Sequence, residues 1–221
     1  IDCQLLETAL LNLVNFQTLV ATKAARVVHA AEGHPVSDFG LRRAQGPDGG
    51  LAVARASYVG GASSTSNVLA GKVYGIPVFG THAHSWVMAF PTELDAFRAF
   101  ARSSPKNCVL LLDTYDVHQG IRNAIVVAKE MEAAGERLAA IRIDSGDLAR
   151  LSKETRAAFD AEGLGYVRIS ASNDLDEYTI QSLFAQGAPI DSFGVGTKLA
   201  TCDPQPSLGG VYKLSATRSQ D

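Results

Sequence analysis

The sequence predicts an α/β protein, an irregular β/α barrel with mostly parallel strands that is preceded by a long helix. Residues 2–31 contain neither Gly nor Pro, and their apolar residues recur at helical spacing. After them, short runs of β-branched and aliphatic residues alternate with helical stretches, which is typical of a parallel sheet covered on both faces. Five of these runs lead into a polar residue, and a barrel gathers such strand ends at one mouth.

The predicted elements follow one another in a regular order. The first helix, at 2–31, ends where Gly33 and Pro35 interrupt it. Strands are predicted in the runs PVSDFG, IPVFGT, NCVLLLDT, AAIRIDS, YVRISAS and DSFGVGT. Helices are predicted between the later strands, at 121–134, 148–161 and 175–186. The stretch VGGASSTSN is expected to form a loop or the entry to a helix.

The polar residues at the strand ends favour a barrel over an open sheet. An open doubly wound sheet would spread them along a crevice, whereas a barrel would bring them around one ligand. The alternative is that these residues only cap the helices that follow, which accounts comfortably for one or two of the five. The residues concerned are Thr81, Asp113, Asp144, Asn173 and Thr197.

Composition excludes several classes of partner. The formal net charge of −3 gives no electrostatic reason to expect nucleic acid or an anionic membrane surface as a ligand. No apolar run approaches the roughly 20 residues of a membrane span. Cys3, Cys108 and Cys202 are far apart and lack zinc-site spacing, so we expect free thiols in a reducing cytoplasm.

The motif RIDSGD places two acids around Ser-Gly at a predicted strand-to-helix turn. Asp144 at such a turn can accept hydrogen bonds from ribose hydroxyls or hold a hydrated Mg²⁺. Arg142 precedes it by two residues and so lies on the same side of an extended strand, where its planar donors suit a carboxylate or phosphate. The alternative is a surface cap with a structural Arg–Asp pair.

Two further motifs indicate an anion site. In FGVGTKL, the amides of Gly194 and Gly196 and the hydroxyl of Thr197 can approach phosphate oxygens, although a glycine turn that only shapes the backbone is nearly as good an explanation. In FGLRRAQGPDGG, Arg42 and Arg43 are expected to point in different directions, so that one serves an anion and the other a structural acid.

The motif GTHAHSW carries two histidines one residue apart. In an extended segment His82 and His84 would face the same side. They could bind a metal ion only with a third protein ligand, and no nearby Cys or His spacing supplies one. Alternatively, one histidine could act as a nucleophile or general base. The pattern alone leaves these alternatives open.

Together, the motifs resemble those of nicotinate phosphoribosyltransferases. FGLRRAQGPDGG, GTHAHSW, DTYDV, RIDSGDL, SNDLDE, FGVGTKL and PSLGGVYKL occur in the order seen in that family, and the resemblance covers about 5–214. It implies an irregular α/β barrel beside a second domain. Residues 1–221 are then expected to be the barrel domain fragment of a longer phosphoribosyltransferase, with the family's N-terminal domain and most of its C-terminal segment absent from this chain.

The resemblance also implies an activity and roles for particular residues. The family forms nicotinate mononucleotide and pyrophosphate from nicotinate and 5-phosphoribosyl-1-pyrophosphate, coupled to ATP hydrolysis, in NAD biosynthesis. His84 matches the histidine that ATP phosphorylates, whereas His82 is treated as its neighbour. Thr81 and Arg142 match contacts to nicotinate, and Asp144 resembles the acid that holds the ribose hydroxyls. The matches to phosphoribosyl pyrophosphate contacts are Arg43, Asp144, Ser172, Asn173, Gly194, Gly196 and Thr197, and Asp113 is placed at the mouth without an assigned role.

Cofactors and rival functions follow from the same resemblance. We expect Mg²⁺ held mainly by the substrate's pyrophosphate with no direct protein ligand, ATP as a co-substrate, and a homodimer with a shared active site. The nearest alternatives are a nicotinamide phosphoribosyltransferase and a nucleotide-binding paralogue without catalytic activity. A barrel aldolase or isomerase would need a Schiff-base lysine or paired acids at a strand end, and Lys198 is the only lysine at a predicted strand end.

Overall fold

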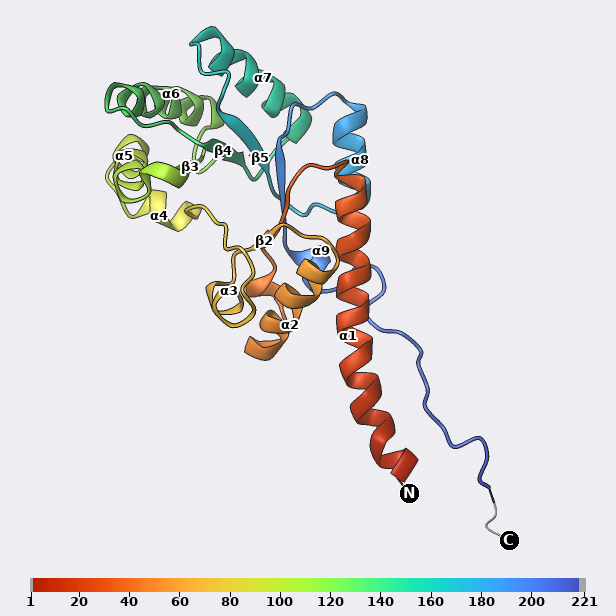
Figure 1. Ribbon diagram of the computed structural model, residues 1–221. Helices are drawn as coiled ribbons and strands as arrows, with labels where there is room; N and C mark the ends of the chain where they lie inside the picture. Colours follow the sequence, from red (N-terminus) through yellow and green to blue (C-terminus); the bar gives the residue numbers. More distant parts are fainter. Residues whose placement is uncertain (1, 219–221) are drawn as a thin grey trace.

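The computed structural model describes residues 2–218 and shows an α/β architecture around one parallel sheet (Figure 1). The strands are β1 (Val36–Asp38), β2 (Ser64–Thr65), β3 (Val109–Leu111), β4 (Ala140–Ile143), β5 (Arg168–Ala171) and β6 (Ser192–Val195). The α-helices are α1 (Asp2–Ala30), α2 (Gly46–Val59), α3 (Val68–Tyr74), α4 (His84–Met88), α5 (Glu93–Ser103), α6 (Val117–Ala133), α7 (Leu148–Ala161), α8 (Glu177–Ala185) and α9 (Thr197–Ala200). Two 3-10 turns, η1 (Leu41–Arg43) and η2 (Pro105–Asn107), complete the list.

The sheet is ordered β2-β1-β6-β5-β4-β3, and every pair of neighbouring strands is parallel. The last strand, β6, therefore pairs with the first, β1, as it does when a barrel closes on itself. The sheet curls as a half-barrel whose two edges are β2 and β3. The predicted fold class, an irregular parallel β/α barrel preceded by a long helix, is confirmed, with an opening between these two edge strands.

The open side of the barrel lies where two sequence predictions need correction. The stretch VGGASSTSN leads into a helix as expected, because Asn67 caps α3, but it also contains the two-residue strand β2. The run IPVFGT, expected to be a strand, makes only a parallel bridge between Val78 and Thr65. Around that bridge, the amide of Thr65 donates to the carbonyl of Pro77 at 3.0 Å and the amide of Phe79 donates back to Thr65 at 3.1 Å. Because Pro77 has no N–H, it cannot extend the ladder as a central strand residue would.

Helix capping by aspartate explains some of the acidic residues that follow strands. The side chains of Asp116, Asp147 and Asp176 accept hydrogen bonds from backbone amides in the first turns of α6, α7 and α8. The observed α7 matches the predicted 148–161, while α6 begins four residues before its predicted start at 121. Asp113 and Asp144 cap no helix, so their place at strand ends needs another explanation.

The hydrophobic core lies mainly between the sheet and the helices that connect its strands. Leu110, Ile141, Ile169 and Phe193, one from each of four neighbouring strands, are at most 1% exposed. The C-terminal half of α1 packs on α2 and α8, while its N-terminal half projects from the rest of the chain and the C-terminal segment runs beside it (Figure 1).

Two further predictions from composition can be compared with the structure. Cys3, Cys108 and Cys202 are all free thiols, as expected from their spacing. Within residues 2–218, no helix has both the length and the apolar character needed to cross a lipid bilayer.

Gly120 allows α6 to lie against the end of β3, and its replacement by alanine is expected to destabilise the fold. A Cβ atom at Gly120 would lie 2.0 Å from the carbonyl oxygen of Leu112, so helix and strand would have to separate. Overpacking of this kind costs about 1–3 kcal/mol. Helix propensity alone predicts the opposite, a gain of about 1 kcal/mol. The free energy of unfolding, measured by urea titration, tests the expected loss.

Gly49 provides the matched control for this substitution. It also lies inside a helix, α2, but the nearest atom to a Cβ there is 3.9 Å away, on Gln45. Gly49→Ala is therefore expected to leave the free energy of unfolding unchanged or to raise it by up to about 1 kcal/mol. A Gly120→Ala variant as stable as Gly49→Ala would show that the approach of α6 to Leu112 is not tight.

Candidate functional site

The carboxyl ends of the strands surround one cavity, and most of the predicted site residues line it. These ends meet because parallel strands in a curled sheet all point the same way. Among the predicted residues, all except Thr81 and Asp113 contribute to the lining. The cavity is formed by Phe39, Arg42, Arg43, Ala83, His84, Arg142, Asp144, Ser172, Asn173, Asp174, Gly194, Gly196 and Thr197.

Arg142, on β4, is held rigidly at the inner wall of the cavity. Its Nε donates to the Thr81 hydroxyl at 3.1 Å, its Nη2 donates to the carbonyl of His82 at 3.0 Å, and its Nη1 donates to the Ser172 hydroxyl at 3.0 Å. Its side chain is only 11% exposed. Burial lowers the pKa of Arg142, and the nearby carboxylates of Asp144 and Asp113 oppose that shift. An arginine stays protonated even so, and two of its five N–H groups remain for Asp144 and a ligand.

Asp144 lies beside Arg142, as the two-residue spacing in the strand predicts. Its Oδ2 is 3.4 Å from Nη1 of Arg142, and its Oδ1 accepts a hydrogen bond of 2.5 Å from the Ser172 hydroxyl. Ser172 thus accepts from Arg142 and donates to Asp144, which fixes both side chains. The same carboxylate reaches His84, whose Nε2 lies 3.5 Å from Oδ2.

Asp113 lies behind the cavity and shapes the turn that carries Asp144. Its Oδ2 accepts from the backbone amide of Asp144 at 2.8 Å and from the hydroxyl of Ser145 at 2.5 Å. The turn also requires Gly146, whose φ of +72° is in the left-handed region. Asp113 was expected at the mouth, but it does not line the cavity. It instead supports the turn that carries Asp144.

Arg42 and Arg43 lie on the turn η1, which a buried carboxylate anchors. Asp38, at the end of β1, is 1% exposed and accepts hydrogen bonds of 2.8 Å from the amide of Gly40 and from the Thr65 hydroxyl. Burial raises the pKa of Asp38, and these two hydrogen bonds oppose the shift. Both arginines line the cavity, and neither forms an ion pair within residues 2–218. The expected division of roles between them, one at an anion and the other at a structural acid, is therefore not observed.

The loop after β6 has glycines for a packing reason as well as a possible binding role. A Cβ atom on Gly194 would lie 2.4 Å from the ring of Phe39, and one on Gly196 would lie 3.2 Å from the carbonyl oxygen of Phe39. The chain after β1 can therefore cross directly over this loop. Thr197 then begins α9 at the rim of the cavity.

The turn after β5 is strained at the edge of the cavity. Asn173 has a φ of 99° and Asp174 a φ of 45°, both in the region that favours glycine. Non-glycine residues in such conformations cost of order 1–3 kcal/mol and persist where the surrounding structure determines them. In these conformations both Asn173 and Asp174 line the cavity.

The two histidines of GTHAHSW do not face the same side, contrary to the prediction from an extended segment. The helix α4 begins at His84, which turns the chain between them. His84 is at the cavity with its side chain 40% exposed, and its Nδ1 lies 3.1 Å from the Thr114 hydroxyl. His82 instead is 5% exposed and packs against Phe97 and Phe100 of α5.

The electrostatic character of the cavity suits an anionic ligand. Three arginines line it, against the two carboxylates of Asp144 and Asp174. Arg42 and Arg43 are on η1, which contacts α9 directly after Gly196, while Arg142 is on β4 and Asp144 follows it. Planar donors from three guanidinium groups can bind carboxylate and phosphate oxygens at separate points. His84, near Asp144 and partly exposed, is available for chemistry at its ring nitrogens.

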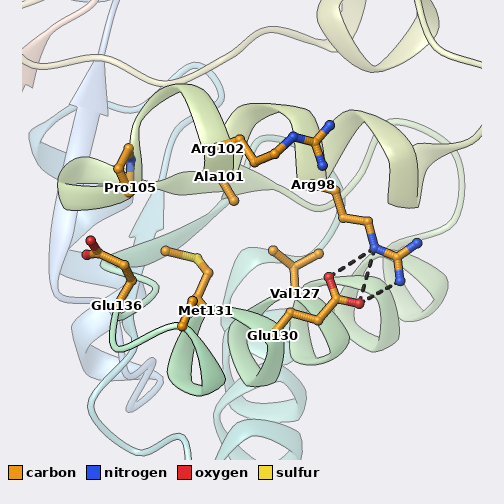
Figure 2. Close-up of a pocket in the computed structure, with 9 residues that line it drawn as sticks. Arg98, Ala101, Arg102, Pro105, Val127, Glu130, Met131 and Glu136 are labelled. Carbon is orange, nitrogen blue, oxygen red and sulfur yellow. Dashed lines mark hydrogen bonds and ion pairs between the residues drawn. The ribbon is translucent and has the colours of Figure 1, made fainter.

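A second hollow lies outside the barrel, between α5 and α6 (Figure 2). Its floor is apolar, with Ala101, Val127 and Met131. Figure 2 shows Arg98 on α5 turned toward Glu130 on α6, and these two side chains form an ion pair of 2.6 Å. None of the predicted site residues lines this groove, so the candidate site is the cavity at the strand ends.

Sequence reasoning missed four lining residues and the groups that support the cavity. Phe39, Ala83 and Asp174 lie within the quoted motifs but were given no role, and only Arg43 of the arginine pair was matched to a substrate contact. The buried Asp38 could have been suspected, because a lone acid ending an apolar strand must be satisfied by hydrogen bonds.

Comparisons with a family model and with known sequences all identify similarity to nicotinate phosphoribosyltransferases. Residues 34–218 match the model of the nicotinate phosphoribosyltransferase (NAPRTase) family. Nicotinate phosphoribosyltransferase pncB2 of Mycobacterium tuberculosis is 52% identical over 218 residues, which cover 98% of this chain and 46% of that protein. The Bacillus subtilis nicotinate phosphoribosyltransferase is 52% identical over 219 residues, covering 98% of this chain and 44% of that protein.

A solved structure of a protein with the same name in the family also has a similar fold. The crystal structure of human nicotinic acid phosphoribosyltransferase superposes with a TM-score of 0.84 at 36% identity, covering 95% of this chain and 51% of that one. The chain thus spans about half the length of the relatives it matches.

Proposed function

The chain belongs to the nicotinate phosphoribosyltransferase family, and on that premise we propose that the whole protein forms nicotinate mononucleotide and pyrophosphate from nicotinate and 5-phosphoribosyl-1-pyrophosphate. We propose further that the reaction is coupled to ATP hydrolysis through phosphorylation of His84 and serves NAD biosynthesis. The observation that carries the proposal is one cavity that is lined by Arg142, Asp144 and His84 together with Arg42 and Arg43 of η1.

The proposed substrates fit the distribution of charge in the cavity. Arg142 would bind the carboxylate of nicotinate with the N–H group that Thr81, His82, Ser172 and Asp144 leave free, and Thr81 would act by holding the guanidinium in place. Asp144 would accept hydrogen bonds from the ribose hydroxyls. Arg42 and Arg43 would bind pyrophosphate oxygens together with the loop from Gly194 to Thr197, and Ser172 and Asn173 complete the same mouth.

The chemistry requires positioning and charge stabilisation. The bond between C1 of the ribose and pyrophosphate breaks with an oxocarbenium-like transition state, while the pyridine nitrogen forms the new bond to C1. The residues would hold the nitrogen close to C1 and stabilise the charge that develops on the leaving pyrophosphate. No side chain is required to attack C1. Phosphorylation of His84 would place negative charge next to Asp144, 3.5 Å away in this structure, and so would change the affinity of the mouth for its anionic ligands.

Magnesium is expected to enter this site with the substrate. Within residues 2–218, no group of three or more His, Cys, Asp or Glu side chains is arranged to hold a metal ion. We therefore propose that Mg²⁺ is bound mainly by the pyrophosphate oxygens of 5-phosphoribosyl-1-pyrophosphate, which octahedral Mg²⁺ commonly uses as ligands. In that position it would neutralise part of the pyrophosphate charge.

The proposal also includes a cytoplasmic homodimer with a shared active site. The exposed apolar surface on the projecting half of α1, where Leu5 is 72% and Leu13 65% exposed, is available to a partner subunit or to the other half of the protein. Apolar side chains in such number on one helix are typical of a surface that is covered in the assembled protein. Sedimentation of the complete protein would show whether it is a dimer.

The aldolase alternative is disfavoured by the surroundings of Lys198. Its Nζ lies 3.3 Å from Asp203 and 3.4 Å from Asp176, and these hydrogen bonds raise the pKa of Lys198. A Schiff-base lysine needs a lowered pKa so that the free amine can attack. Lys198 is also absent from the cavity lining.

The proposed function is tested by turnover of the complete protein. With 5-phosphoribosyl-1-pyrophosphate and Mg²⁺, we expect nicotinate mononucleotide from nicotinate, faster product formation when ATP is added, and little product from nicotinamide. Chromatography of the products measures all three. A preference for nicotinamide would favour the alternative phosphoribosyltransferase, and binding of the nucleotide without turnover would favour the non-catalytic paralogue.

A further inference from the structure

The open side of the barrel leaves the edge of β3 without a neighbouring strand. Directly after β3, the amide of Leu112 donates to the carbonyl of Arg142 on β4 at 3.0 Å. Amides alternate in direction along a strand, so the amide of Leu111 points to the other side, toward the opening. An unpaired buried amide is costly, and some group must accept its hydrogen bond.

The imidazole of His82 is that group. Its Nε2 accepts from the amide of Leu111 at 3.1 Å. The ring is 5% exposed and packs against Phe97 and Phe100 of α5, with centroid distances of 5.8 and 4.8 Å. Because Nε2 accepts a hydrogen bond, the ring must be neutral with its hydrogen on Nδ1, which lies 3.5 Å from the carbonyl of Ala83.

The backbone of the same residue holds the guanidinium of Arg142. The carbonyl of His82 accepts from Nη2 of Arg142 at 3.0 Å and from the Thr81 hydroxyl at 2.8 Å. The Thr81 oxygen in turn accepts from Nε of Arg142. Two of the three protein contacts that orient Arg142 therefore depend on where the Thr81–His82 segment lies, and the ring of His82 fixes that segment to β3.

We propose that His82 is a positioning residue for the reaction: its neutral imidazole replaces the missing strand beside β3 and so fixes the carbonyl and hydroxyl groups that aim Arg142 at the carboxylate of the substrate. The proposal rests on the proposed function and extends it to substrate discrimination. His82 acts through Arg142 and Thr81 and touches no substrate.

The surroundings of His82 keep its ring neutral. The charged or titratable groups that act on it are Arg142 of β4 and His84 of α4, both of which disfavour a positive charge on the ring, while the hydrogen bond to the carbonyl of Ala83 favours one. The helix α5 presents two phenylalanine rings and β3 presents a backbone amide. Burial, with these two groups, lowers the pKa of His82 to about 4. Protonation of Nε2 would remove the acceptor for Leu111 and release the segment.

Substitutions at His82 separate positioning from simple support of the fold. His82→Leu keeps an apolar side chain but offers Leu111 no acceptor, whereas the side-chain oxygen of glutamine in His82→Gln can reach about as far as Nε2 and accept the same bond. We expect His82→Leu to lower the ratio of nicotinate to nicotinamide affinity by about 10-fold, because a displaced Arg142 loses a charge-assisted hydrogen bond that only the carboxylate accepts. His82→Gln should restore most of the ratio.

The experiment is titration calorimetry of nicotinate and nicotinamide with the complete protein and both variants. An affinity ratio does not depend on the fraction of folded protein, so a purely structural role would leave it unchanged. If the wild-type protein itself shows no preference for nicotinate, the proposed function fails and the positioning role fails with it. If the wild type discriminates and His82→Leu keeps the same ratio, only the positioning role of His82 is overturned.

Nuclear magnetic resonance of histidine provides a second test that needs neither ligand nor turnover. In ¹⁵N-histidine-labelled protein, His82 is expected to show the tautomer with hydrogen on Nδ1 and no titration from pH 8 down to about 5.5, because its pKa is about 4. A titration of His82 near pH 6.5, or the opposite tautomer, would overturn the proposed bond to Leu111.

Discussion

Replacing His84 with alanine is expected to abolish phosphorylation of the protein by ATP, and with it the ATP-dependent increase in mononucleotide synthesis. His84 is partly exposed at the cavity and buries little apolar surface, so the fold should survive the change. Transfer of the ribose to nicotinate should continue without coupling, because His84 is not required at C1. Intact-protein mass spectrometry after incubation with ATP measures the phosphorylated species, at neutral or basic pH because phosphohistidine is labile in acid.

Two other histidines serve as controls for this prediction. His118 lies on α6, with its side chain 50% exposed and 3.9 Å from Glu154, and it does not line the cavity. His118→Ala should therefore be phosphorylated like the wild type. His82→Gln should also be phosphorylated, because the ring of His82 is buried away from the cavity. Phosphorylation that persists in His84→Ala and disappears in His82→Gln would reverse the assignment.

The link between His84 and the ribose site also gives the coupling a structural basis. Asp144 lies 3.5 Å from Nε2 of His84 and 3.4 Å from Nη1 of Arg142. A phosphoryl group on His84 would therefore act on the carboxylate proposed to hold the ribose and on the guanidinium proposed to hold nicotinate. Charge added at one of these groups must change the hydrogen bonds available at the other two.

Local sequence patterns were sufficient for the fold class and for much of the cavity. Alternation along a strand placed Arg142 and Asp144 on one side, and the structure shows them in contact. The same reasoning explains why polar residues after several parallel strands meet. Asp147 directly precedes the helix predicted at 148–161 and caps it, whereas Asp144 lies three residues earlier and caps no helix.

The parts that could not be predicted depend on contacts between distant segments. The amide of Leu111 donates to the ring of His82, which lies 29 positions earlier, and no local pattern indicates that the two face each other. Likewise, Asp38 accepts from the amide of Gly40 before the turn with Arg42 and Arg43, and it is itself held by the hydroxyl of Thr65, 27 positions later. The prediction that His82 and His84 face one way was wrong because it assumed an extended chain, whereas α4 begins at His84. A two-residue strand such as β2 is defined by its neighbours and is too short for a periodic signal.

Arg142 is the residue on which discrimination between nicotinate and nicotinamide should depend. Nicotinate carries a carboxylate where nicotinamide carries a neutral amide. Arg142 is held at the cavity by three protein hydrogen bonds. A charge-assisted hydrogen bond to a carboxylate contributes about 1.5–3 kcal/mol. Removal of the guanidinium also frees Thr81 and Ser172, which should weaken both ligands, so the informative quantity is the ratio of the two affinities.

Arg142→Ala in the complete protein is therefore expected to weaken nicotinate by roughly 10- to 150-fold more than nicotinamide, a range that corresponds to the energy of one such bond. Titration calorimetry with each ligand measures the two dissociation constants. Arg150→Ala, which removes an exposed guanidinium paired with Glu154 on α7, is the control and should change neither constant. An equal loss for the acid and the amide in Arg142→Ala would show that Arg142 supports the cavity without recognising the carboxylate.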